Sequence, residues 1–180
     1  MEGAAGEGAS APSGTASRSA DSELTNLIDI DTAPPPFTLL AHAGPISPDD
    51  LRGASYVLYF YPKDDTAGCT REAQDFSTLG GEFSALGVRV LGVSRDSPES
   101  HAKFRAKHAL SVELASDPDG RTCALFGVWV EKSMYGRKYF GIERATFLFD
   151  RAGVLRRSWR KVKVPGHAAE VLAAARALCT

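Results

Sequence analysis

From Leu27 onward, short apolar runs alternate with amphipathic stretches, a pattern typical of an α/β protein. Residues 56–61 are all aromatic or aliphatic, without polar alternation, which predicts a central strand buried on both faces. Pro62 ends this run. After a loop, Cys69 opens a helical pattern whose apolar positions recur every three residues until Gly80 and Gly81 interrupt it.

The rest of the chain completes this pattern. Ser97, Pro98 and Glu99 supply a cap, a first helical position and a first-turn acid, so we expect a helix from there to about residue 108. The other predicted strands are 37–40, 88–93, 144–149 and 154–159, the other helices 122–126 and 167–178, and the turns 117–120 and 150–153. The order βαβαβ followed by ββα predicts a mixed central β-sheet flanked by helices on both faces.

The first 24 residues differ from the rest. Gly, Ala and Ser dominate this stretch, and no aromatic residue precedes Phe37. Such a stretch buries too little apolar area to offset the entropy of ordering it, so residues 1–24 are predicted to be a disordered tail and residues 25–180 one folded domain. A degenerate targeting peptide is the alternative for the tail, but Arg18 is its only basic residue and such peptides are usually rich in arginine.

The composition of the chain argues against several classes of binding partner. The 180 residues carry 21 Lys and Arg against 22 Asp and Glu, and a net charge of −1 does not favour binding to nucleic-acid phosphates. The apolar runs are shorter than a membrane-spanning helix requires, so we expect neither nucleic acid nor a membrane as a partner. The 3 cysteines form neither a disulfide framework nor a zinc-ligand pattern, and the N-terminal residues lead us to expect no secretory leader, which favours a reducing compartment such as the cytoplasm.

Cys69 is the candidate for chemistry because of its position. It lies in the first turn of a predicted helix, just past the carboxyl end of a predicted strand, where ligands bind in open α/β sheets. Unpaired amides and the positive end of the helix dipole favour an anion there, including a thiolate. The alternative is a structural cysteine, since a free cysteine also packs as a small hydrophobic residue.

Pro62, Thr66 and Cys69 form the pattern P-x-x-x-T-x-x-C, and here the sequence resembles the peroxiredoxins. The wider text is similar to the bacterioferritin-comigratory-protein (PrxQ) subfamily, over residues 29 to about 178. The segments that carry the resemblance are 33–39 (APPPFTL), 59–70 (YFYPKDDTAGCT), 126–129 (FGVW), 131–136 (EKSMYG) and 141–148 (GIERATFL). It implies a thioredoxin-like fold and a thiol-dependent peroxidase without a cofactor, which reduces hydrogen peroxide and organic hydroperoxides to water and alcohols in antioxidant defence and cell redox homeostasis.

The resemblance also implies roles for particular residues. Cys69 is the nucleophile that becomes a sulfenic acid, Arg144 lies beside its sulfur, and Pro62 shields that sulfur from water. The Thr66 hydroxyl is expected to accept from the peroxide and donate toward the thiolate. From the residues alone, Thr66 is also a helix cap, Arg144 a surface ion-pair partner and Pro62 a strand terminator. Glu72, one turn beyond Cys69, is a candidate to orient Arg144 or an ordinary first-turn acid.

The chain departs from the subfamily in the resolving cysteine, the second cysteine of the catalytic cycle. Many members carry it five residues after the first, where this chain has Gln74, and others on the next helix, where residues 98–108 contain none. Cys179, on a predicted frayed end, and Cys123, predicted to be buried, remain as possible resolving residues. We therefore expect a one-cysteine cycle, with thioredoxin or a small-molecule thiol as reductant, in a monomer or weak dimer.

Two other classes of function remain at this stage. A thiol–disulfide oxidoreductase needs a second cysteine three residues from Cys69, where Thr66 and Glu72 stand. A redox sensor would be oxidised at Cys69 but turn over slowly. Three further groups of residues are weaker candidates. The aromatic residues that could line an entrance or pack in the core are Trp129, Tyr135 and Tyr139, and the dispersed histidines, which form no ligand set, are His42, His101, His108 and His167. The basic residues that we interpret as a solvated face are Arg151, Arg156, Arg157, Arg160, Lys161 and Lys163.

Overall fold

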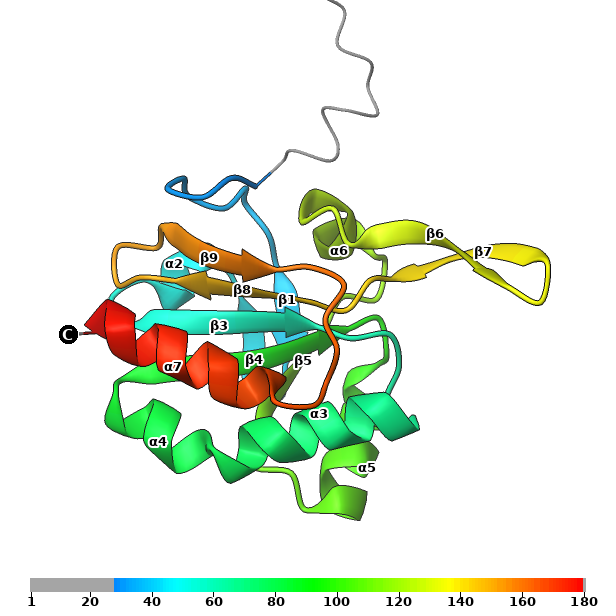
Figure 1. Cartoon of the computed structure of the whole chain (residues 1–180), viewed down its shortest axis with the longest axis horizontal. Coiled ribbons are helices and arrows are strands. Elements are labelled where there is room, and N and C mark those ends of the chain that lie inside the picture. The colour runs from blue at the N-terminus through cyan, green and yellow to red at the C-terminus, as the bar shows by residue number, and fades with distance from the viewer. Residues whose placement is uncertain (1–27, 180) are drawn as a thin grey trace, which may run out of the picture.

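A computed structural model describes residues 28–179, so the prediction for residues 1–24 lies outside the described part. Its main feature is a seven-stranded sheet in the order β2-β1-β5-β4-β3-β8-β9. The strands β3, β4 and β5 run parallel, and the other pairs are antiparallel (Figure 1). The strands are β1 (Leu39–Ala41), β2 (Gly44–Ile46), β3 (Ser55–Phe60), β4 (Val88–Ser94), β5 (Glu113–Ser116), β8 (Ala145–Phe149) and β9 (Leu155–Trp159).

β3 is the central strand that the apolar run predicts. Every residue of it is buried, and its side chains alternate between two separate cores on the two faces of the sheet. Tyr56, Leu58 and Phe60 belong to one core. Val57 and Tyr59 belong to the other, which also contains Cys69.

Helices cover both faces, as predicted. Residues of α3, α4, α5 and α7 contribute to the core that contains Cys69, and residues of α2 and α6 to the opposite core (Figure 1). The bounds are α2 (Pro48–Leu51), α3 (Ala67–Thr78), α4 (Gly80–Ala85), α5 (Pro98–His108), α6 (Arg121–Leu125) and α7 (His167–Cys179). Gly80 and Gly81 do not end helical structure: the break falls at Leu79, and Gly80 begins α4.

A second sheet was not predicted. Strands β6 (Trp129–Met134) and β7 (Arg137–Ile142) form a two-stranded hairpin that extends from the body of the protein (Figure 1). Tyr135 and Gly136 at its tip both have positive φ, of 52° and 79°, as a tight hairpin turn requires. Within residues 28–179, no helix combines the length and the apolar character needed to cross a membrane.

Candidate active site

Cys69 lies at the start of α3, where the chain leaves the carboxyl end of β3. Thr66 is the N-cap and Cys69 the third helical residue. The Thr70 amide donates to the Thr66 carbonyl at 2.8 Å, so the Cys69 amide precedes this first α-helical bond and is one of the amides that a helix start leaves free. The Cys69 side chain is 2% exposed. The sulfur is therefore enclosed but has donors of the helix start beside it.

Arg144 reaches the sulfur because of the strand register. Ala145 at the start of β8 pairs with Phe60 at the end of β3, which places Arg144 beside the loop that leads to α3. Its Nη2 donates to the Cys69 sulfur at 3.4 Å, and its Nη1 donates to Glu72 Oε1 at 2.6 Å. The structure thus brings together Cys69, Arg144 and Glu72, and the guanidinium bridges thiol and carboxyl.

Burial and charge act in opposite directions in this cluster. Burial by itself lowers the pKa of Arg144, but Glu72 and the Cys69 sulfur outweigh it and leave that pKa above its ordinary value. Burial raises the pKa of Glu72 to about 7 although Arg144 opposes the shift. The other carboxyl oxygen of Glu72, Oε2, is buried without a hydrogen-bond partner. Arg144 is therefore a permanent cation, while Glu72 changes charge near neutral pH.

Thr66 and Pro62 both precede Cys69 in the sequence. The Thr66 hydroxyl donates to the Lys63 carbonyl at 2.9 Å, so its single proton is not directed at the Cys69 sulfur, contrary to the expected donation toward the thiolate. Its lone pairs remain available as acceptors. The side chain also makes no capping bond to the helix, although Thr66 is the N-cap residue. Pro62 is half-buried and follows Tyr61, whose amide makes the last sheet bond, to Val93 at 3.0 Å.

The other two cysteines lie far from Cys69. Cys123 in α6 is fully buried in the core on the opposite face of the sheet, and burial raises the pKa of its thiol far above the ordinary value. Cys179 is exposed at the end of α7 and lines an open cavity of about 1030 Å³ together with Ser55, at the start of β3. Because β3 has 6 residues, which span roughly 20 Å, Cys69 and Cys179 lie at opposite ends of it.

The β6–β7 hairpin adds a residue that the sequence did not single out. Burial and the nearby positive charge of Arg144 lower the pKa of Lys132, while the Cys69 sulfur opposes this shift. Lys132 pairs in register with Tyr139, which is 42% exposed. Its charge therefore acts on the active site from the hairpin. The local signal for the hairpin was the pair Tyr135 and Gly136, which forms its turn.

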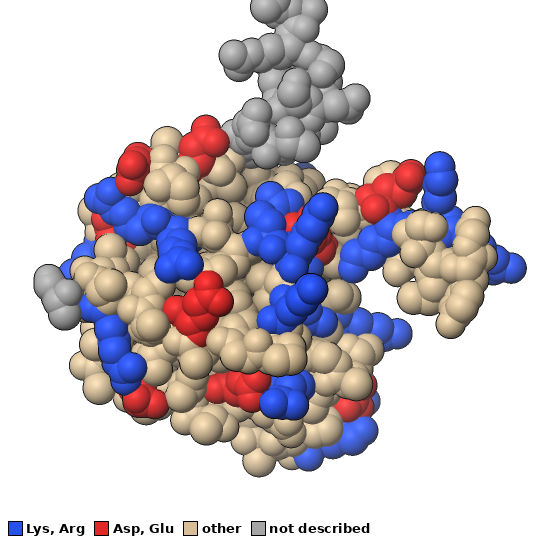
Figure 2. Space-filling model, viewed as in Figure 1, with Lys and Arg blue, Asp and Glu red and all other residues tan. Residues whose placement is uncertain are grey.

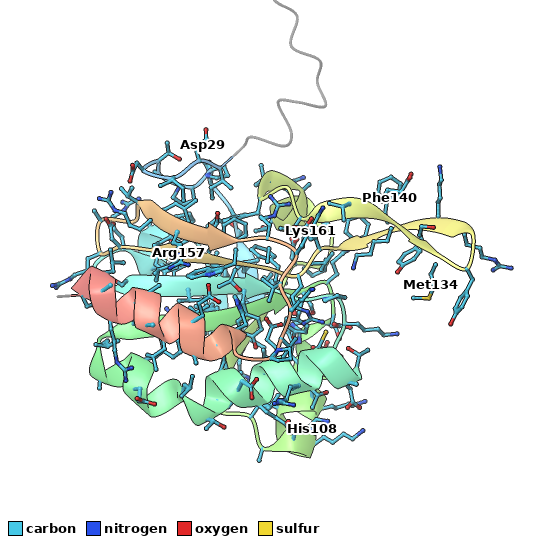
Figure 3. All side chains as sticks on the ribbon, in the orientation of Figure 1. Asp29, His108, Met134, Phe140, Arg157 and Lys161 are labelled. Carbon is cyan, nitrogen blue, oxygen red and sulfur yellow. The ribbon has the colours of Figure 1, made fainter. Side chains whose placement is uncertain are left out.

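The aromatic candidates of the hairpin differ in their surroundings, since Trp129 packs against the core opposite Cys69 whereas Tyr139 is 42% exposed. Tyr135 is 98% exposed at the tip. Trp129 is half-buried and stacks on Phe140, with the Arg95 guanidinium 4.7 Å from the centre of its ring. In Figure 3, Phe140 and Met134 lie on the hairpin, away from the helices. Packing is therefore the wrong interpretation for Tyr135.

The basic stretch that follows β8 is a solvated face, as predicted. Its arginines pair with acids: Arg156 donates to Asp31 and Asp150, both at 2.7 Å, and Arg160 donates to Glu143 at 2.7 Å. Figure 2 shows acidic side chains among the basic ones on this side of the molecule. Among the dispersed histidines, His101 and His167 are buried.

Known proteins match most of the chain, including the segment that carries Cys69. The model of the AhpC/TSA family matches residues 30–158. A putative peroxiredoxin bcp of Coxiella burnetii is 49% identical over 146 residues, which cover 81% of this chain and 97% of the relative. Peroxiredoxin Bcp of Xanthomonas campestris is 50% identical over 140 residues, or 78% of this chain and 82% of the relative.

Solved structures agree with these relatives. Bacterioferritin comigratory protein of Xanthomonas campestris superimposes with a TM-score of 0.76 at 46% identity, over 80% of this chain and 92% of that one. A mutant of Xylella fastidiosa PrxQ gives a TM-score of 0.78 at 39% identity, over 83% of this chain and 96% of that one. The fold is accordingly thioredoxin-like, as expected. The chain belongs to the AhpC/TSA family and, within it, to the Bcp (PrxQ) peroxiredoxins, which are thiol-dependent peroxidases.

Proposed function

We propose that Cys69 is the nucleophile of this peroxidase and that the cycle uses no second cysteine of the chain. The Cys69 thiolate attacks the hydroxyl oxygen of a hydroperoxide, and the O–O bond breaks as the S–O bond forms. The sulfur is oxidised by two electrons to a sulfenic acid. The other oxygen leaves as an alkoxide or hydroxide and takes up the proton that the thiol released, to give an alcohol or water.

The observation that carries this proposal is the position of the Arg144 guanidinium, whose Nη2 lies 3.4 Å from the sulfur. A permanent cation at this distance stabilises both the thiolate and the negative charge that develops on the leaving oxygen. The free amide of Cys69 supplies a second donor toward the same charge. Glu72 positions Arg144 through the bond at 2.6 Å and is itself out of contact with solvent.

Thr66 and Pro62 complete the proposed site. With its proton held by the Lys63 carbonyl, the Thr66 hydroxyl is limited to accepting, and it accepts the hydrogen bond of the peroxide hydroxyl. This orients the oxygen that is transferred toward the sulfur. Pro62 has no amide hydrogen and shields the sulfur from water.

An external thiol then closes the cycle. It attacks the sulfenic acid, water leaves, and a mixed disulfide forms; a second thiol releases reduced Cys69 and a disulfide of the reductant. Cys123 lies across the sheet and Cys179 at its far end, whereas a disulfide needs Cα atoms within about 7 Å. Gln74, at a usual resolving position, is exposed and has no sulfur.

The reductant that we propose is thioredoxin or a small-molecule thiol, and the peroxides are hydrogen peroxide and organic hydroperoxides. The Xanthomonas relative is described by its alkyl peroxide reduction activity, which supports the organic substrates. The three cysteines are unpaired, which supports a reducing compartment such as the cytoplasm. We propose a monomer or weak dimer, with a role in antioxidant defence.

The test is peroxide consumption with dithiothreitol as reductant. Cys69→Ser should abolish it, because serine forms no accessible anion at neutral pH, while circular dichroism stays that of the native fold. Cys123→Ser is the matched control and should retain turnover. Wild-type turnover in Cys69→Ser would contradict the assignment.

A further inference from the structure

A buried polar cluster joins the loop between β3 and α3 to helix α5. Asp64 lies in this loop, and its carboxyl Oδ2 lies 2.8 Å from Nδ1 of His101 and accepts from the Ser100 hydroxyl at 2.8 Å. Oδ1 accepts from the Tyr61 hydroxyl at 2.6 Å. The Asp64 amide donates to Asp96 at 2.8 Å. The side chains of Asp64 and His101 are only 4% and 5% exposed.

The hydrogen bonds fix the orientation of this pair. Nε2 of His101 lies 3.1 Å from the Ala115 carbonyl oxygen, which accepts only, so Nε2 carries hydrogen. Nδ1 faces a carboxyl oxygen that already accepts from Ser100. Burial by itself raises the pKa of Asp64, but the bonds from His101 and Tyr61 outweigh it and hold that pKa below its ordinary value. Asp64 is thus a carboxylate, and both ring nitrogens of His101 face acceptor oxygens.

Stability alone does not explain a buried pair of this kind. Desolvation of buried polar and charged groups offsets most of their attraction, and well-packed apolar residues of similar volume commonly serve stability equally well. What a buried pair with this many directed hydrogen bonds adds is a fixed geometry. Here the bonds hold Asp64 from three segments of the chain, namely the end of β3, the start of α5 and, through Asp96, the residues after β4. The Ala115 carbonyl of β5 in turn holds His101.

The segment held in this way leads directly into the active site. Asp64 is two residues before Thr66 and five before Cys69. Between them Asp65 has a φ of 58°, a left-handed conformation that a residue other than glycine adopts only when its surroundings hold it. A second, outer contact holds Asp65, whose carboxylate lies 2.7 Å from both Lys107 Nζ and His108 Nε2.

We propose that Asp64 and His101 are positioning residues for peroxide reduction: they hold the loop between β3 and α3 so that the Thr66 hydroxyl and the Cys69 amide meet the peroxide opposite Arg144. This inference rests on the proposed role of Cys69. Neither residue touches the sulfur or the peroxide. Both act through the conformation of the loop, and the pair is therefore needed for the rate of oxidation rather than for the nucleophile itself.

Two substitutions of His101 separate its contacts. Asparagine places an amide donor near the position of Nδ1, where it reaches Asp64. Glutamine places a donor near Nε2, where it reaches the Ala115 carbonyl but not Asp64. Both remove the imidazole ring and leave a polar side chain of reduced size. A positioning role through Asp64 predicts that His101→Asn oxidises within about threefold of the wild-type rate, and that His101→Gln and Asp64→Asn lose on the order of 10- to 100-fold.

The measured quantity is the second-order rate constant for oxidation of reduced Cys69 by hydrogen peroxide in stopped flow, on full-length protein. Melting temperature and the rate of Cys69 alkylation by iodoacetamide are measured on the same variants. Local unfolding would expose the sulfur and speed alkylation, whereas misplacement of the loop slows peroxide oxidation with alkylation kept within about threefold. Lys103→Gln is the control, since Lys103 is exposed on α5, outside the cluster that holds the loop, and its replacement should leave the oxidation rate unchanged.

The outcomes distinguish the two proposals. Equal rates in wild type, His101→Gln and Asp64→Asn would overturn the positioning role and leave Cys69 as the nucleophile. Equal losses in His101→Asn and His101→Gln that follow their melting temperatures would also overturn it, because a purely structural pair gives that result. A wild-type protein without peroxide-dependent oxidation of Cys69 would contradict the proposed function itself.

Discussion

Gly68 lets Arg144 approach the sulfur, and adding one methyl group there tests the importance of this approach. Gly68 is in the first turn of α3, and a Cβ at this position would lie 3.2 Å from Nη2 of Arg144. The same nitrogen donates to the Cys69 sulfur at 3.4 Å. In Gly68→Ala the guanidinium must retreat by a few tenths of an ångström, which weakens a hydrogen bond that is already long.

The expected effects on rate and on stability have opposite signs. A displacement of 1 Å in a reacting geometry costs up to about 10²-fold, so a few tenths of an ångström correspond to a loss of roughly three- to tenfold in the rate of Cys69 oxidation. Alanine in place of a helical glycine adds up to about 1 kcal/mol to the free energy of unfolding. Gly68→Ala should therefore be a slower enzyme with an unchanged or higher melting temperature.

Stopped-flow oxidation by hydrogen peroxide and thermal unfolding measure the two quantities. Gly81→Ala is the matched control: it also lies in a helix, α4, and a Cβ there would meet nothing within 4 Å. It should melt no lower than wild type and react at the wild-type rate. If Gly68→Ala also reacts at the wild-type rate, the close approach of Arg144 does not contribute to the transition state, and the role assigned to the guanidinium fails.

Three further predictions concern the charges and the other cysteines. Arg144→Ala should lower the oxidation rate by about 10²- to 10³-fold, the usual cost of one donor to developing charge, and should slow alkylation by iodoacetamide; unchanged rates would make Arg144 a structural ion-pair partner. Burial raises the pKa of Glu72 from 4.5 to about 7, so the stability that Glu72 contributes is present below pH 4.5 and lost as the pH rises through 7. Relative to Glu72→Gln, the wild type should lose about 3 kcal/mol of unfolding free energy between pH 4.5 and pH 8 in urea titrations, and parallel pH profiles would contradict the shift. Cys123→Ser and Cys179→Ser, alone or combined, should retain most dithiothreitol-dependent turnover, and loss of turnover in either would identify a resolving cysteine.

The parts of the fold that the sequence predicts are those with strong local signals. The uninterrupted apolar run becomes β3, buried on both faces. The cap and proline before residue 99 begin α5 at Pro98, and the Ser97 hydroxyl accepts from the Ser100 amide at 3.1 Å. These features depend on neighbouring residues, so local patterning is sufficient to find them.

The β6–β7 hairpin was missed because it buries little. Its side chains are mostly exposed or half-buried, so neither face has a continuous apolar pattern that would set it apart from a loop. The one local signal is the pair Tyr135 and Gly136, whose positive φ values close the turn. Lys132, which faces the active site from this hairpin, could not be assigned without it.

Contacts between segments that are distant in the sequence could not be predicted from local sequence patterns. Arg144 lies 75 residues after Cys69, and the register of β8 against β3 brings them together, so only the resemblance to peroxiredoxins placed them side by side. Asp64 and His101 are 37 residues apart and join through the packing of α5. The dispersed histidines therefore gave no indication in the sequence that one of them is buried against an acid.

Intact-mass analysis of the wild-type protein after one equivalent of hydrogen peroxide, with and without dimedone, shows whether Cys69 is the nucleophile of a one-cysteine cycle. We expect the gain of one oxygen, trapped by dimedone as a single adduct that peptide mapping locates at Cys69, and no such adduct in Cys69→Ser. Because no internal thiol competes, excess peroxide without reductant should carry Cys69 on to the sulfinic acid. Rapid and complete formation of a disulfide from Cys69 to Cys123 or Cys179, or oxidation that persists in Cys69→Ser, would contradict this role of Cys69.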